Sequence, residues 1–276
     1  MKIKSIFILG IATLAMLSCH RGPKPPVSQQ NLPISMSKPA KGDKAIYGLA
    51  CMGCTDSVVI MLPNQGGDPV KYNILEANRN RQVFGNIEVG DWICIIPAKE
   101  KNKASMVIDL DKLKATWTYQ VMPHLRDVTH LSKKQQRILA NMPDSIVETY
   151  MIPREYGFTL KRMGEARSVG MVATNSSVED DSPVEYPKVP LYTEWHAYNG
   201  KLILVKGRYE FNNVVFNKKT TYDTLSFVYM KDDSLALRDS RGNIQSYHRK
   251  ANARTANAAA QKAAQKAAEK IKEELK

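Results

Sequence analysis

Hydrophobic and polar residues alternate in short runs along most of the chain, and Val, Ile and Thr are frequent in these runs. Such runs are typical of β-strands that bury one face. Between residues 44 and 112 the pattern predicts strands at 45–51, 57–62, 92–96 and 105–110. A dense turn signal, Pro-Asn-Gln-Gly-Gly-Asp-Pro, separates the second of these runs from the rest. This part of the chain is therefore predicted to form a small sheet of short strands.

Residues 113–250 show the same strand pattern around a single predicted helix. The helix, 131–141, begins after Ser132, a favourable N-cap residue, and ends at Met142-Pro143. Asn199-Gly200 and Asp232-Asp233 stand between strand-like runs and predict hairpin turns. The strand-like runs after the helix are 146–152, 157–162, 168–173, 191–198, 201–206, 222–230 and 234–238. This succession predicts an up-and-down antiparallel barrel.

The last segment, 251–276, repeats Ala-Ala-Gln-Lys and has a very high helix propensity, so it predicts a helical tail. We therefore predict an all-β protein with two small antiparallel β-barrels in series, followed by this tail. The first barrel, at 44–112, would be of the SH3 or OB type, and the second would occupy 113–250.

The beginning of the chain has the composition of a bacterial export signal. Lys2 and Lys4 precede an apolar stretch at 5–18, which is short for a transmembrane helix. The stretch runs directly into Cys19. Residues 14–19, Leu-Ala-Met-Leu-Ser-Cys, resemble the lipobox of Gram-negative bacterial lipoproteins.

This resemblance implies that residues 1–18 are a signal peptide and that Cys19 is lipidated. The Pro-rich residues 19–43 would then form a tether between the membrane and the folded part. His20 stands where an Asp would retain such a lipoprotein in the inner membrane, so we expect the outer membrane. No acidic run follows Cys19, which favours the periplasmic side over the cell surface.

The chain is strongly basic, with a formal net charge of +13 at pH 7. The mature chain would carry +11, because the signal contains two lysines and no acidic residue. No basic helix with interleaved aromatic residues is present, so nucleic acid is not an expected partner. Acidic lipid head groups, an anionic cell-wall or glycan surface, or an envelope protein fit this charge better.

The second predicted barrel is similar to lipocalin-like domains. The similarity rests on Thr116-Trp117 at the opening, Asn199-Gly200 in the middle, and Tyr247-His-Arg249 at the close. The family's structural Trp and Arg carry over to Trp117 and Arg249, whose indole and guanidinium groups attract each other and would close the barrel floor. The resemblance implies a cup for a small apolar ligand, in or at the mouth of the barrel, although a filled core fits a barrel of this size equally well.

Cys51-Met-Gly-Cys54 is the sharpest chemical feature of the chain. Two cysteines at this spacing can form a disulfide, act as reactive thiols or provide two metal ligands. We predict a structural disulfide between Cys51 and Cys54, because the motif lies between strand-like runs and lacks a second ligand pair. Cys94 lies within an apolar run and is expected to be a buried small hydrophobe, or else a third sulfur for the pair.

No catalytic constellation is present, and the five histidines lack metal-ligand spacing. We therefore predict a membrane-anchored envelope lipoprotein with a non-enzymatic binding or structural role and no cofactor. The alternative is a thiol-redox or metal-binding protein that uses Cys51 and Cys54.

Overall fold

The computed structural model describes residues 40–170, 182–207, 210–211, 214–215, 219–251 and 262. This part of the chain is mostly β-structure, as the sequence predicts. None of the helices in the described ranges is long and apolar enough to cross a membrane. The predicted signal peptide, Cys19 and most of the tether lie outside the described residues, as does the predicted tail apart from Ala251 and Lys262.

The first sheet has six strands in the order β3-β2-β1-β5-β6-β4, with β4 parallel to β6 and all other pairs antiparallel. Its strands are β1 (Ile46–Ala50), β2 (Val58–Pro63), β3 (Val70–Asn73), β4 (Val83–Phe84), β5 (Trp92–Pro97) and β6 (Ala104–Asp109), and α1 (Leu75–Arg79) follows β3. A parallel bridge from Asn73 to Lys103 brings the end of β3 to the start of β6. Val59, Ile93 and Val107 are fully buried in the core of this sheet.

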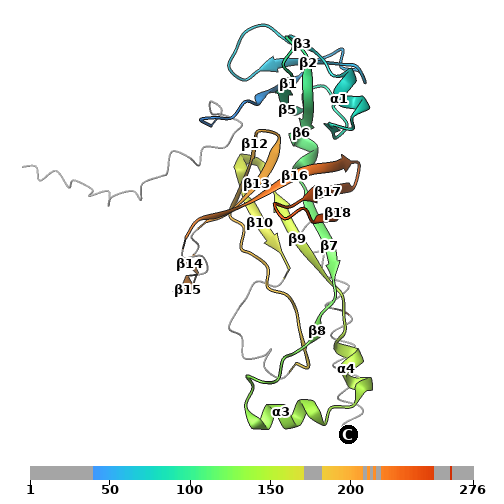
Figure 1. The fold of residues 1–276 in the computed structure, drawn as a ribbon, viewed down its shortest axis with the longest axis vertical. Coiled ribbons are helices and arrows are strands. Elements are labelled where there is room, and N and C mark those ends of the chain that lie inside the picture. Colours follow the sequence, from blue (N-terminus) through green and yellow to red (C-terminus); the bar gives the residue numbers. More distant parts are fainter. Residues whose placement is uncertain are drawn as a thin grey trace, which may run out of the picture. The chain divides into compact units, whose positions relative to one another are not determined.

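The second sheet has eight strands in the order β10-β9-β7-β18-β17-β16-β13-β12, and every pair is antiparallel. Its strands are β7 (Thr116–Val121), β9 (Arg154–Leu160), β10 (Ala166–Val169), β12 (Glu194–Tyr198), β13 (Lys201–Lys206), β16 (Thr221–Lys231), β17 (Ser234–Arg238) and β18 (Ile244–Lys250). A bridge between Glu165 and Glu194 joins the two edge strands, and the Ala166 amide donates to the Thr193 carbonyl at 3.0 Å. The sheet is therefore a nearly closed barrel in which successive strands are neighbours (Figure 1).

The short segments around these sheets complete the described structure. They are α2 (Leu110–Leu113), β8 (His124–Leu125), α3 (Lys133–Ala140), α4 (Asp144–Tyr150), the 3₁₀ turn η2 (Arg162–Gly164), β11 (Val184–Glu185), β14 (Glu210–Phe211) and β15 (Val214–Val215). Helix α3 confirms the predicted helix and its N-cap, because the Ser132 hydroxyl accepts from the Gln135 amide in a capping box.

The predicted strand at 146–152 is wrong, because this segment forms helix α4. Pro143 has the extended backbone of an N-cap residue and Asp144 occupies the first turn, so a second helix begins directly after α3. The apolar residues Ile146, Val147 and Tyr150 are spaced for one helix face as well as for a strand. A short apolar run cannot distinguish these alternatives by periodicity alone.

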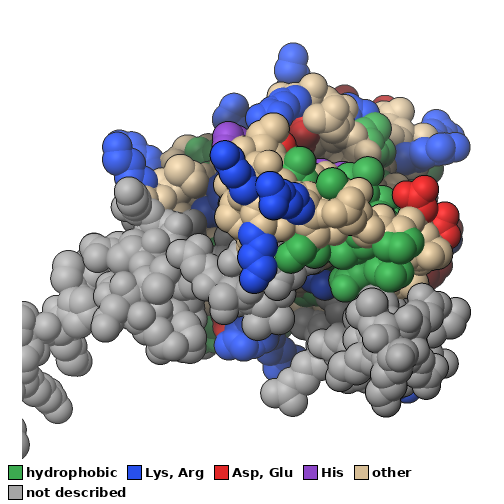
Figure 2. Space-filling view, turned by 90° about the horizontal axis from the view of Figure 1, so that it is seen from below, with side chains coloured by type: hydrophobic (Ala, Val, Ile, Leu, Met, Phe, Trp, Pro, Cys, Tyr) green, Lys and Arg blue, Asp and Glu red, His purple; other side chains and the backbone are tan. Residues whose placement is uncertain are grey.

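The α3–α4 segment has few contacts with the core. Neither helix contains a buried residue, and Leu125 and Ile138 expose 61% and 46% of their surface. Figure 2, which views the molecule from below relative to Figure 1, shows hydrophobic side chains at the surface beside several Lys and Arg side chains. This segment is therefore held mainly by its own hydrogen bonds and by the β8–β11 pair.

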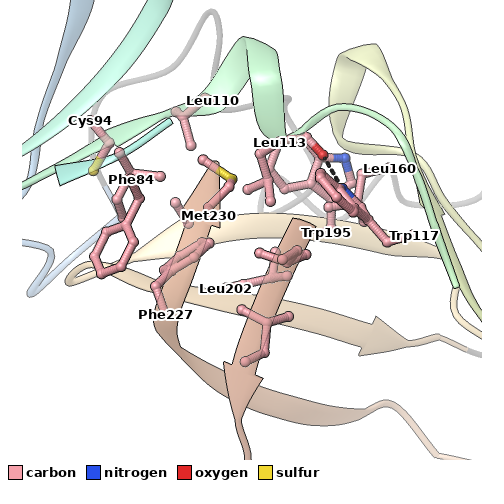
Figure 3. Packing of buried hydrophobic residues seen from close by; sticks show 14 of the residues in the cluster. Phe84, Cys94, Leu110, Leu113, Trp117, Leu160, Trp195, Leu202, Phe227 and Met230 are labelled. Atoms are coloured by element: carbon pink, nitrogen blue, oxygen red, sulfur yellow. Dashed lines mark hydrogen bonds between the residues drawn. The ribbon is translucent and has the colours of Figure 1, made fainter. Parts of the chain in front are cut away.

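The two sheets share one hydrophobic cluster. Tyr47, Phe84 and Cys94 of the first sheet belong to the same buried cluster as Trp117 and Phe227 of the second. The rings of Phe84 and Phe227 are 5.3 Å apart, and Figure 3 shows the buried side chains of both sheets pointing toward one another. The closed end of the second sheet is thus packed against the first sheet.

Candidate functional site

Trp117 and Arg249 lie together at the end of the second sheet next to α2. The sequence predicted them as a structural pair. Trp117 is fully buried, and its Nε1 donates to the Leu113 carbonyl at 2.8 Å. The Arg249 guanidinium lies 4.9 Å from the centre of the Trp117 ring, and its Nη2 donates to the Lys112 carbonyl at 2.6 Å. This end of the barrel is therefore closed by an indole, a guanidinium and the backbone of α2.

The interior next to this closed end is filled by side chains. The residues buried together there come from successive strands of the second sheet: Trp117, Phe158, Leu160, Trp195, Leu202, Leu204, Phe227, Leu235 and Leu237. Figure 3 shows Trp117, Leu160, Trp195 and Leu202 converging on the same region. A barrel of eight strands encloses only enough space for its own side chains or one small ligand, so this half is a core rather than a cup.

Three tyrosines occupy the other half of the barrel, and Phe158 lies between them and the filled half. These four residues are called the aromatic end cluster: Tyr119, Phe158, Tyr192 and Tyr247. Tyr119 lies two residues beyond Trp117 on β7, and Tyr247 lies two residues before Arg249 on β18, so both are displaced away from the closed end. The rings of Tyr119 and Tyr247 meet edge to face at 5.4 Å. Phe158 contacts Tyr247 at 5.1 Å and Tyr192 at 6.3 Å.

The hydroxyl groups of this cluster differ in their partners. Tyr192 donates to Asp223 Oδ2 at 2.9 Å, and Lys206 Nζ lies 2.6 Å from Asp223 Oδ1. Within the described residues, the hydroxyls of Tyr119 and Tyr247 make no hydrogen bond. Burial raises the pKa of all three tyrosines, and the Asp223 carboxylate adds to this effect at Tyr192 and Tyr247. All three are therefore protonated donors at neutral pH.

This arrangement offers apolar ring faces together with two unused phenol donors. Tyr119 and Tyr192 are half-buried, so part of each ring can contact a bound molecule. A site of this kind suits a small, largely apolar molecule that carries one or two hydrogen-bond acceptors.

Cys51 and Cys54 are free thiols, so the predicted disulfide is not formed in this structure. The Cys54 Sγ is engaged locally instead: it lies 3.1 Å from the Cys51 carbonyl and accepts from the Ile60 amide at 3.4 Å. In the described part of the chain, no group of three or more His, Cys, Asp or Glu side chains is placed to hold a metal ion.

Cys94 is fully buried on β5, as expected for a small hydrophobe. Burial, with a contribution from the Asp43 carboxylate, raises the pKa of its thiol to about 12. It belongs to the hydrophobic cluster shared by the two sheets and does not join Cys51 and Cys54. The third-sulfur alternative is therefore not supported.

No protein-family model matches the chain, and no curated protein matches it. Among solved structures, the chain is similar to a lipocalin-like protein from Bacteroides thetaiotaomicron VPI-5482, at 19% identity and a TM-score of 0.26, over 50% of this chain and 96% of the other. Strand pairing within the second sheet, with the bridge between its edge strands, makes it a nearly closed barrel.

The sequence interpretation located the closed end of the barrel but did not identify the aromatic end cluster. A signal was present, because a period of two places Tyr119 on the same face as Trp117, and Tyr247 on the same face as Arg249. Phe158 and Tyr192 gave no comparable signal, since their positions depend on the register of the whole sheet.

Proposed function

We propose that this protein is a non-enzymatic binding lipoprotein of the Gram-negative envelope, which holds a small apolar ligand at the aromatic end cluster. In this proposal Cys19 is lipidated and anchors the chain in the outer membrane, with the folded part on the periplasmic side. Residues 19–43 serve as the tether. The first sheet would be a small barrel of the SH3 or OB type, and the bridge from Asn73 to Lys103, which joins the end of β3 to the start of β6, supports this view.

The observation that carries the proposal is the contrast between the two halves of the second sheet. One half is filled by tightly buried aliphatic and indole side chains and closed by Arg249. The other half presents three tyrosine rings beside Phe158, two of them half-buried, with phenol groups at Tyr119 and Tyr247 that lack a partner among the described residues. Half-buried rings next to a preformed core are where an apolar ligand gains contact area without displacing packed side chains.

The proposal is tested by titrating the purified protein with N-phenyl-1-naphthylamine, a neutral apolar fluorophore whose emission rises in apolar surroundings. We expect saturable binding of one probe molecule. Tyr119→Leu should weaken it by about fivefold, because ring stacking contributes on the order of 1 kcal/mol beyond area burial. Tyr222→Ala is the matched control, since Tyr222 is an exposed tyrosine on β16 outside the cluster.

Circular dichroism spectra and melting temperatures of both variants would show whether the fold is retained. Tyr119→Phe provides a second comparison, because it keeps the ring and removes the hydroxyl. It should bind the neutral probe as well as the native protein does. Failure of the native protein to bind the probe, or equal affinity in the Tyr119→Leu and Tyr222→Ala variants, would overturn the proposal.

A further inference from the structure

A cleft of about 500 Å³ lies at the junction of the two sheets, away from the aromatic end cluster. One wall is formed by the Cys54–Asp56 loop, α1 and residues 81–87, and the other by the end of β16. The walls are fixed to each other, because the Gly85 amide donates to the Met230 carbonyl at 2.9 Å and Asn86 Nδ2 donates to Asp232 Oδ1 at 3.0 Å. The cleft is therefore a preformed feature of the fold, and its volume lies in the range of small-molecule sites.

The floor of the cleft is apolar and its rim is cationic. Buried side chains from both sheets form the floor: Val59, Ile74, Phe84 and Met230. Arg81 and Lys231 stand at the rim on opposite walls, and both are exposed. Among the described residues, neither side chain has a hydrogen-bond or ion-pair partner. Asp56 is the one carboxylate that lines the cleft, so the rim carries an excess of positive charge.

Arg81 is held at the rim by the end of α1. The Gln82 amide donates to the Ala77 carbonyl at 2.7 Å, and the Arg81 amide donates to the Asn78 carbonyl at 3.0 Å, which is the Schellman pattern of a helix C-terminus. Arg81 has a φ of 55°, in the left-handed region where this motif usually has Gly. The chain thus places a long cation at a position where the backbone favours the smallest residue.

From these observations we infer that the cleft binds a single-chain amphiphile with an anionic head. The apolar tail would lie on the floor formed by Phe84, Met230 and their neighbours. The carboxylate or phosphate head would lie between the Arg81 guanidinium and the Lys231 ammonium. A head group bound in this way would make charge-assisted hydrogen bonds to both walls at once. This site is separate from the aromatic end cluster and does not depend on the function proposed for it.

The test is isothermal titration calorimetry of the purified protein with dodecanoate and with dodecyl phosphate, and dodecanol serves as the uncharged comparison. We expect at least one of the anions to bind with a stoichiometry of one, and dodecanol to bind about tenfold more weakly or worse, because a charge-assisted contact of this kind is lost. Arg81→Gly and Lys231→Gln should each weaken anion binding by a similar factor.

Arg81→Gly separates a binding role from a structural one. Glycine relieves the left-handed backbone strain at this position, so the variant should melt at the same temperature as the native protein or higher, and still lose affinity. Arg79→Gln is the matched control, since Arg79 is an exposed cation in the last turn of α1 that does not line the cleft. Tyr119→Leu should leave anion binding unchanged, so a failure at one site does not imply a failure at the other.

The two cysteines provide a second readout on the same protein. Cys54 lines the cleft and Cys51 does not, although both are partly exposed. In reduced protein, bound dodecanoate should slow alkylation of Cys54 by iodoacetamide and leave that of Cys51 unchanged, as followed by peptide mass mapping. Absence of binding by both anions, equal binding of dodecanol, or affinities that Arg81→Gly and Lys231→Gln do not change would overturn the inference.

Discussion

Asp109 is a fully buried carboxyl group between the two sheets, and its replacement by Asn should change how stability depends on pH. It is the last residue of β6 and the N-cap of α2, and its Oδ1 accepts from the amides of Asp111 and Lys112 at 3.0 and 2.9 Å. Its Oδ2 is buried and accepts no hydrogen bond from any residue that the structure describes. Burial raises the pKa of Asp109 to about 7, and the nearby Asp91 carboxylate adds to the shift.

The sign and size of the effect follow from linkage. An Asp in an unfolded chain has a pKa of about 3.9. Between roughly that pH and about 7, the folded protein therefore holds a proton on Asp109 that the unfolded chain has lost. The free energy of unfolding should fall by about 1.4 kcal/mol per pH unit through this interval, or on the order of 4 kcal/mol in total. The contribution is fully present at the acidic end of the interval and is lost as the pH rises through the folded-state value.

Asp109→Asn keeps an oxygen that can accept from the amides of Asp111 and Lys112 but cannot ionise. The free energy of unfolding of the variant should therefore equal that of the native protein near pH 4 and be higher than that of the native protein at pH 8. The assay is urea unfolding followed by tryptophan fluorescence at intervals between pH 4 and pH 8. Asp68→Asn is the control, because Asp68 is an exposed carboxylate on a turn of the first sheet. Parallel pH profiles for Asp109→Asn and the native protein would refute the reasoning, as would a variant that is less stable at pH 8.

Two further predictions concern the second sheet. Gly157 has a φ of 155°, and a Cβ there would lie 1.9 Å from the Trp117 carbonyl oxygen, so Gly157→Ala should cost on the order of 3 kcal/mol or more in urea unfolding. Gly66→Ala is the control for backbone strain without a clash, because Gly66 also has a positive φ but faces open space. It should cost only about 1 kcal/mol. Equal losses of stability in Gly157→Ala and Gly66→Ala would contradict this account. Arg249→Lys should cost about 1–2 kcal/mol, because lysine lacks the planar group that covers Trp117. Arg238→Lys, at an exposed position on β17, should cost nothing measurable, and a similar loss in both would count against a specific role for Arg249.

Local signals in the sequence predicted much of the second sheet. Asn199-Gly200 forms a hairpin turn in which both residues have positive φ, as this pair favours, and β12 and β13 follow from it. Ser132 begins a helix through its own hydroxyl, which is a short-range effect. Trp117 and Arg249 meet because they lie on neighbouring strands of the second sheet at paired positions. These features depend on residues a few positions apart or on one strand pairing.

The remaining features depend on contacts that a sequence pattern does not encode. The residues of the cleft come from four separate stretches of the chain, and nothing in the alternation around Arg81 or Lys231 indicates that they face each other. Phe84 lies on a strand of only two residues, which is too short to give a period. Its burial against Phe227 depends on how the two sheets pack, not on the sequence around either residue.

The hydrophobic cluster shared by the two sheets limits how far the two parts of the chain can be treated as interchangeable modules. A cut near residue 112 would leave Tyr47 and Phe84 facing water on one fragment and uncover Trp117 and Phe227 on the other. Neither fragment would have a complete hydrophobic core. The second sheet could therefore be fused into another protein only if that protein supplied apolar residues to bury the closed end of the sheet. Insertions and gene fusions should be tolerated best in the exposed α3–α4 segment, where no buried side chain would be disturbed.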